Sequence, residues 1–241
     1  MPLKVKKTNQ LESLYPKILI MGGSGAGKTY FLASGNTKKT LIISVKTESG
    51  LMTLHDFDID YVEIESFKDI QEIYNYLKSP ENKYETVGID SLTQLQECLI
   101  KNDLKSLSGF EKWAQVKELT FEIVQRFKTL PINAIFICES DEDKDDKTGE
   151  IKVYPRLVGK SKQTIAHWFD EVYYFKRIEE IDNEGNKSII YTALTQSGDK
   201  YPCKSRIGTL PRVIVNPELD KIISQLKRKT TPKGGVSNAN K

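Results

Sequence analysis

The segment between residues 22 and 29 constrains this chain more than any other feature of its sequence. It reads Gly22-Gly23-Ser24-Gly25-Ala26-Gly27-Lys28-Thr29, which fits the pattern G-x-x-x-x-G-K-[S/T] at every fixed position. Apolar residues up to Met21 predict a strand before it, and the residues after Gly27 predict a helix. A glycine-rich turn in that context directs backbone amides and a helix N-terminus at phosphate groups. We expect a phosphate-binding loop rather than a purely structural turn.

The side chains at the end of this loop have separate expected roles. Lys28 is expected to reach the β- and γ-phosphates of a nucleoside triphosphate, and Thr29 to offer its hydroxyl to Mg²⁺. The sequence thus predicts Mg-ATP binding, with these cofactor-binding residues: Gly22, Gly23, Ser24, Gly25, Ala26, Gly27, Lys28, Thr29 and Tyr30.

An acid at the end of a second apolar strand fits the same chemistry. Residues 86–89 predict a buried strand that ends at Asp90, which is expected to contact Mg²⁺ through water. The alternative is a plain helix-capping aspartate. Ser91 and Gln94 are spaced as a capping pair for the next helix.

Hydrolysis also needs a group that orients the attacking water. Glu48 follows the predicted strand Thr40–Val45 and is expected at the carboxyl edge of the sheet, where ligands of open α/β sheets bind. We favour Glu48 for this role over a solvated loop glutamate. Glu139 and Ser140 close the predicted strand 132–138 and are either sensors of the γ-phosphate or a simple strand end. The expected catalytic residues are Lys28, Glu48 and Asp90.

Strand-like and helix-like segments alternate along most of the chain, which predicts a mostly parallel sheet flanked by helices. Helices are expected near 67–77, 91–105 and 111–129. Beyond Glu139 turn signals at 146–149 and 183–186 predict hairpins that add antiparallel strands to one edge of the sheet. A last helix is expected near 217–228, with Pro217 at its first position. We expect one domain over residues 1–226 and a flexible tail over 227–241.

Composition narrows the class of protein. No apolar run approaches the length of a membrane span, and the N-terminus lacks the apolar stretch of a secretory signal. The odd number of cysteines favours the reducing cytoplasm over a disulfide framework. The net charge of +3 comes from residues 227–241, which hold basic residues and no acids. That tail either keeps the protein soluble or attracts phosphate.

Several of these features together resemble a known family. The chain resembles phage-encoded P-loop nucleotide-binding proteins (AAA-family ATPases) with a minimal RecA-like core. The segments that carry the resemblance are the loop Gly22–Thr29, Ile89-Asp90-Ser91, Glu48-Ser49-Gly50, Phe169-Asp170 and Lys204-Ser205-Arg206. Some members act in single-strand annealing or recombination. The resemblance covers residues 15–215 and implies an Asp90 strand that is not adjacent to the P-loop strand. It also implies a homo-oligomer with ATP sites at subunit interfaces, in which Lys204 and Arg206 reach the neighbour's γ-phosphate. The alternative is that Lys204 and Arg206 are ordinary charged residues on the protein surface.

Three weaker sequence signals could indicate binding of nucleic acid or calcium. Lys152, Tyr154, Arg156, Lys160 and Lys162 interleave basic residues with an aromatic, as a loop that binds single-stranded DNA does, or as exposed hairpin charges do. Residues 141–146 are expected to be a solvated mobile loop rather than a calcium loop. Trp113 and Trp168 are expected to flank the core rather than stack on bases.

These observations favour a RecA-like P-loop ATPase that acts on single-stranded DNA in phage recombination or replication. The alternatives are a nucleotide-dependent interaction or loader module without DNA activity of its own, and a small-molecule kinase. The kinase is disfavoured because no arginine-rich lid is apparent in the sequence.

Overall fold

The computed structural model describes residue 5 and residues 15–159, 161–181, 184–196, 198 and 200–230. For residues 228–230 it describes the backbone alone. Its strands are β1 (Lys17–Gly22), β2 (Thr40–Val45), β3 (Asp60–Ile64), β4 (Thr86–Asp90), β5 (Asn133–Lys144), β6 (Ile151–Pro155), β7 (Glu171–Ile181), β8 (Lys187–Leu194), β9 (Lys204–Ser205) and β10 (Val213–Val215). Its α-helices are α1 (Lys28–Ala33), α2 (Phe67–Lys78), α3 (Leu92–Lys101), α4 (Gly109–Lys128), α5 (Ser161–Thr164) and α6 (Leu219–Thr230). Short 3-10 helices are η2 (Thr37–Lys39), η3 (Gly50–Leu54) and η4 (Ile165–Trp168).

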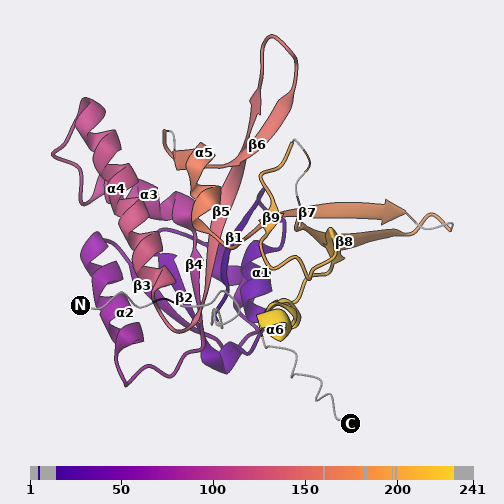
Figure 1. The fold of residues 1–241 in the computed structure, drawn as a ribbon, viewed down its shortest axis with the longest axis horizontal. Coiled ribbons are helices and arrows are strands. Elements are labelled where there is room, and N and C mark those ends of the chain that lie inside the picture. The colour runs from indigo at the N-terminus through magenta and orange to yellow at the C-terminus, as the bar shows by residue number, and fades with distance from the viewer. Residues whose placement is uncertain are drawn as a thin grey trace.

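The central sheet has the strand order β10-β8-β7-β1-β5-β4-β2-β3 (Figure 1). Strands β7, β1, β5, β4, β2 and β3 run parallel, and β8 and β10 add antiparallel strands beyond β7. β5 separates β4 from β1, so the Asp90 strand is not adjacent to the P-loop strand, as expected. The carboxyl ends of these parallel strands lie at one edge, where ligands of open α/β sheets bind.

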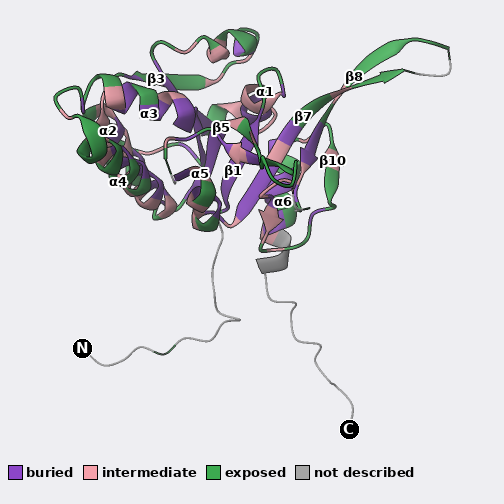
Figure 2. Ribbon diagram, turned by 90° about the horizontal axis from the view of Figure 1, so that it is seen from above, coloured by how far each residue is buried: buried purple, intermediate pink, exposed green. Residues whose placement is uncertain are grey.

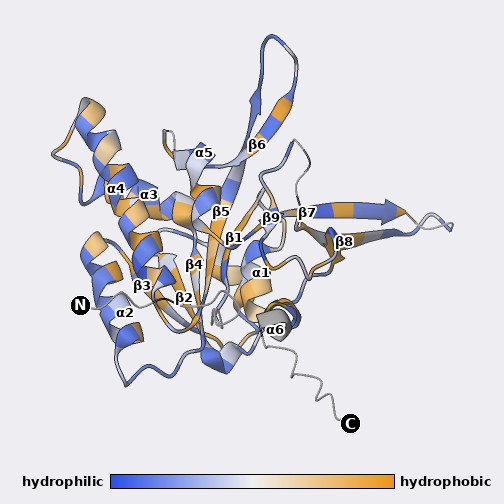
Figure 3. Cartoon of the chain, viewed as in Figure 1, coloured by the Kyte–Doolittle hydropathy of each residue, from blue (hydrophilic) through white to orange (hydrophobic). Residues whose placement is uncertain are grey.

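Helices cover both faces of the sheet because its strands are apolar on both faces. Along β1, Leu19 and Met21 join the core cluster under α2, α3 and α4, whereas Ile18 and Ile20 join the one under α1 and α6. The central strands are accordingly buried (Figure 2) and carry most of the hydrophobic residues (Figure 3). The expected α/β architecture is therefore confirmed.

The hairpin of β5 and β6 differs from expectation. β5 continues to Lys144, and its residues 140–144 pair antiparallel with β6 in a ribbon that projects from the sheet (Figure 1). The expected loop over 141–146 is therefore wrong as far as Lys144, and this hairpin does not lie at the sheet edge. Its acids occupy successive positions of a largely exposed ribbon, where ion pairs such as Lys162–Asp143 and Lys200–Glu142 stabilise them.

The last helix also differs from expectation. α6 begins at Leu219, two residues after Pro217, because the hydroxyl of Ser34 accepts a hydrogen bond from Leu219 N at 3.0 Å and fixes the helix start. It continues to Thr230, so it includes residues 227–230 of the predicted tail. Residues 231–241 lie outside the described residues.

Candidate functional site

The loop between β1 and α1 has the shape that its glycines allow. A Cβ at Gly22 would lie 2.4 Å from the carbonyl oxygen of Phe175 on β7, so no larger residue fits there. Gly25 and Gly27 adopt φ values of 72° and 85°. L-residues rarely adopt this left-handed conformation. The strand, loop and helix predicted around residues 22–29 are present.

Lys28 extends back over its own loop. Its Nζ donates hydrogen bonds to Gly22 O at 2.9 Å and Gly23 O at 2.8 Å. Burial lowers the pKa of Lys28 from 10.5, and the nearby carboxylates of Asp90 and Glu139 oppose that shift. A cation held among loop carbonyls and amides is suited to the terminal phosphates of a nucleotide.

Thr29 and Asp90 meet at the base of the loop. Thr29 Oγ1 donates to Asp90 Oδ2 at 2.6 Å, which joins the start of α1 to the end of β4. Asp90 is only 5% exposed, and burial raises its pKa, whereas the hydrogen bond from Thr29 lowers it. Hard oxygen donors next to a phosphate loop are the ligands that Mg²⁺ prefers, so this pair fits the predicted metal site.

Glu48 lies beside this pair, on the loop after β2. The N–H of Ser91 donates to its carboxylate. Its Oε2 is buried and has no hydrogen-bond partner within the described part of the chain. Burial, with the nearby negative charge of Asp90, raises the pKa of Glu48 to about 7. A carboxylate with one free oxygen and a pKa near neutrality is suited to hold and deprotonate a water.

One cavity of about 400 Å³ connects these groups. It is lined by Ser24, Gly25, Ala26, Gly27, Lys28, Thr29, Tyr30, Glu48, Gly50, Thr53, Asp90, Ser91, Ile137, Glu139 and Tyr191. The structure thus brings the expected catalytic residues Lys28, Glu48 and Asp90 together with the predicted phosphate loop. Glu139 lines the same cavity, which is where a sensor of the γ-phosphate has to lie.

Comparison with known families agrees with this geometry. Residues 14–207 match the model of a family described as an AAA domain. The chain belongs to this AAA domain family. No curated protein matches the chain. The family supports a P-loop ATPase, and the mixed α/β sheet of this AAA domain has the RecA-like arrangement that the sequence predicted. No described helix of the AAA domain is long and apolar enough to cross a membrane.

Sequence reasoning missed a part of the site that comes from the C-terminal half of the chain. Tyr191 on β8 packs against the phosphate loop, and a Cβ at Gly27 would lie 2.9 Å from its ring. A neighbouring cavity of about 560 Å³ shares Gly27, Tyr30 and Tyr191 with the first and extends to Asn216 and Pro217. Asn216 has a positive φ of 46° and accepts a hydrogen bond from Tyr191 N at 3.1 Å. Only pairing across the β7–β8–β10 edge places these residues here, so no local motif marks them.

Lys204 and Arg206 are not brought to the phosphate loop of their own chain. Lys204 pairs with Val172 near the amino end of β7, whereas Gly22, where the phosphate loop begins, is level with Phe175, three residues farther along β7. Arg206 donates to Asp170 at 3.1 Å. Their predicted contact with a neighbour's nucleotide stays a prediction.

The basic residues predicted to bind DNA are mostly paired with acids. Arg156 pairs with Glu139 at 2.7 Å, Lys152 with Glu150 at 3.4 Å, and Lys162 with Asp143. Lys162 also lies 5.6 Å from the ring centre of Tyr154. Lys160 lies outside the described residues. The hairpin therefore offers less free positive charge than its sequence suggests.

Proposed function

We propose that this AAA domain binds Mg-ATP and hydrolyses its γ-phosphate. The observation that carries the proposal is the placement of Lys28, Thr29, Asp90 and Glu48 around one cavity at the carboxyl edge of the sheet. Thr29 and Asp90 would hold Mg²⁺, which neutralises charge on the phosphates when bound. Glu139 and Ser140 remain alternatives for sensing the γ-phosphate.

Each residue then has one task. Lys28 and the loop amides bind the β- and γ-phosphates, and the nucleobase lies in the cavity between Tyr30 and Tyr191. Glu48 orients a water molecule and takes its proton as the water oxygen bonds to the γ-phosphorus. The bond from that phosphorus to the β,γ-bridging oxygen breaks, and ADP keeps the electron pair.

The test is the Lys28→Ala variant. It removes the one side-chain cation of the loop, so ATP binding or turnover should fall by about tenfold or more. Circular dichroism provides the folding control. Normal ATPase activity in this variant would refute the site assignment.

We further propose an action on single-stranded DNA in phage recombination or replication, by a homo-oligomer. The resemblance of the sequence supports this, and so does the hairpin of β5 and β6, which leaves the nucleotide cavity directly after Glu139. Ion pairing on that hairpin, together with its many acids, instead favours the rival reading, a nucleotide-dependent interaction or loader module.

One experiment separates the two readings. ATPase rate and fluorescence anisotropy of a labelled oligothymidylate are measured at several salt concentrations, with and without a non-hydrolysable ATP analogue. DNA-stimulated turnover with salt-dependent binding supports the recombination function. If the protein does not bind the oligothymidylate at low salt with nucleotide present, the result supports the interaction or loader module instead.

A further inference from the structure

Helix α4 has an apolar stripe that the core does not use. Its core stripe includes Val116, Leu119, Ile123 and Phe127. A second stripe recurs at helical spacing on another side of the helix, at Phe110, Trp113, Ala114 and Phe121, with Lys117 between them. Phe110 is 89% exposed, Trp113 49% and Phe121 43%. Exposed aromatic residues gathered on one face are typical of a binding surface.

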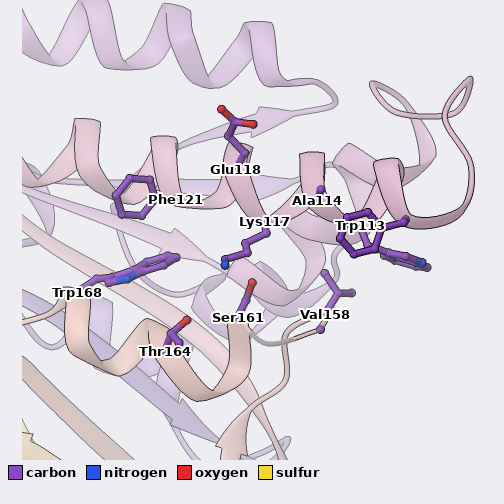
Figure 4. A pocket seen from close by; sticks show the side chains of 11 residues that line it. Trp113, Ala114, Lys117, Glu118, Phe121, Val158, Ser161, Thr164 and Trp168 are labelled. Carbon is purple, nitrogen blue, oxygen red and sulfur yellow. The ribbon is translucent and has the colours of Figure 1, made fainter.

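This second stripe forms one wall of a groove of about 830 Å³, and α5 and η4 form the other wall. Figure 4 shows Trp168 and Phe121 at one end and Trp113 at the other, with Lys117 extending into the space between them. The rings of Phe121 and Trp168 meet edge to face, with their centres 4.9 Å apart. Lys128 Nζ donates to the backbone carbonyl of Trp168 and holds that end in place.

The groove also contains an unsatisfied polar group. Ser161 lines it and is fully buried, yet its Oγ has no hydrogen-bond partner in the part of the chain that the structure describes. Figure 4 shows this hydroxyl on the side that faces Lys117. A buried hydroxyl without a partner costs free energy, which a ligand that reaches it would recover.

Hydrogen bonds of one buried side chain hold the two walls of the groove together. Gln96 on α3 accepts a hydrogen bond from Val158 N at 2.9 Å and donates to Thr120 on α4 at 2.9 Å. One buried side chain therefore ties the loop on one side of the groove to the helix on the other. A preformed groove loses less free energy on binding than one that must be ordered first.

We propose that this groove binds an acidic peptide segment of a partner protein. An aromatic or large aliphatic side chain of the peptide lies between Trp113 and Trp168, and a neighbouring carboxylate pairs with Lys117 and reaches Ser161. Charge complementarity selects this occupant, since Lys117 extends into the groove and Glu118 points away from it (Figure 4). Lys117 is the one basic side chain of the described lining, which is enough to pair with one carboxylate of a peptide but does not form the positive track that a nucleic acid backbone needs. The proposal does not depend on ATP hydrolysis.

The protein carries its own reporter for this site. Its two tryptophans, Trp113 and Trp168, both line the groove. Anilinonaphthalene sulfonate combines an aromatic body with an anion, so it serves as the probe, with excess Mg-ADP present to cover the nucleotide cavity. We expect dye emission to rise while tryptophan emission falls by energy transfer.

Two variants and a matched control test where the dye binds. Trp113→Ala and Lys117→Glu should each weaken dye binding by about three- to tenfold. Lys105→Glu makes the same charge change at an exposed residue outside the groove and should leave binding unchanged. Circular dichroism confirms that each variant is folded. Equal dye affinity in all of these proteins overturns the proposal.

Competition identifies the occupant. A short synthetic peptide with an Asp-Leu-Phe-Asp core should displace the dye, and the same peptide with Lys in place of Asp should not. Displacement by both peptides or by neither overturns the proposal. Displacement by oligothymidylate assigns the groove to nucleic acid instead. Loss of the dye signal with rising protein concentration, together with a dimer in sedimentation, assigns it to a second copy of the chain.

Discussion

Arg156 Nη1 lies 2.7 Å from Glu139 Oε2, so a guanidinium on the loop after β6 neutralises a carboxylate that lines the nucleotide cavity. The backbone reinforces this pair, because Arg156 N donates to Glu139 O at 2.7 Å. Thr93 Oγ1 donates to Arg156 O at 3.1 Å and accepts from Glu139 N at 3.0 Å. The projecting hairpin is thereby joined to the edge of the cavity that we assign to ATP.

Removing the guanidinium should weaken ATP binding. In Arg156→Ala, Glu139 keeps its charge beside the triphosphate without a partner. The pair is partly exposed, so we expect the Kd for ATP to rise about two- to fivefold, measured by calorimetry. Placed in a Glu139→Gln background, Arg156→Ala should have little further effect. The same loss in both backgrounds would show that Arg156 acts independently of Glu139.

The pH dependence of turnover should report Glu48. Its pKa is raised to about 7, mainly by burial, and only the deprotonated form accepts a proton from water. We expect kcat to rise as pH increases through about 7. Glu48→Gln should lose most turnover and this limb of the profile, and should keep ATP affinity within a few-fold. An equal loss of affinity and turnover would refute the role of Glu48 as the base.

Glu48 should also lower stability at alkaline pH. Its folded pKa, about 7, lies above the ordinary value of 4.5, so the folded protein binds this proton more tightly than the unfolded chain does. Its contribution to the free energy of unfolding is therefore present below about pH 4.5 and is lost as pH rises to about 7. Because the side chain is partly exposed, Glu48→Gln should gain only about 1 kcal/mol at pH 8. Thermal unfolding at pH 8 and pH 5 checks this, and the same gain at both values would contradict it.

Asp90 should act through the metal. Thr29 Oγ1 donates a hydrogen bond to Asp90 Oδ2 at 2.6 Å. Asp90→Asn keeps an oxygen that can accept this hydrogen bond, so the fold should persist. The lost charge should raise the Mg²⁺ concentration needed for half-maximal turnover by about tenfold. Magnesium titration of the ATPase measures this, and nucleotide binding in EDTA is the control. An unchanged magnesium requirement would mean that Asp90 serves only to end β4.

Local sequence was sufficient for the part of the site built from neighbouring residues. The loop around Lys28 and the strand end at Asp90 each depend on a single strand and the turn after it, and the carboxyl ends of parallel strands meet at one edge. The same reasoning places Glu48 at this edge, where it lines the cavity. Ser91 accepts the expected capping hydrogen bond from Gln94 N at 3.3 Å.

Features set by distant contacts could not be predicted. The consecutive acids of residues 141–143 suggest a loop by composition, whereas antiparallel pairing to β6 places them in a strand. The aromatic stripe of α4 overlaps its core stripe in sequence, so periodicity alone did not separate the two faces. Trp113 was expected beside the core, but it lines an open groove at 49% exposure.

Tyr191 provides the last prediction, because it separates recognition of the base from recognition of the phosphates. Its ring packs against Gly27 and forms a wall of the cavity that continues past the phosphate loop toward Asn216. A nucleobase in that cavity would stack on the ring, and stacking of this kind contributes about 1–3 kcal/mol. Tyr191→Ala should therefore weaken ATP binding by about tenfold, whereas Tyr191→Phe should keep it. Inorganic tripolyphosphate has no base, so its affinity should be unchanged in Tyr191→Ala. Tyr61→Ala, on β3 at the opposite edge of the sheet, is the control for loss of an exposed tyrosine. Calorimetric titration of both ligands into each variant decides the matter, and an equal loss for ATP and tripolyphosphate would show that Tyr191 supports the phosphate loop instead of the base.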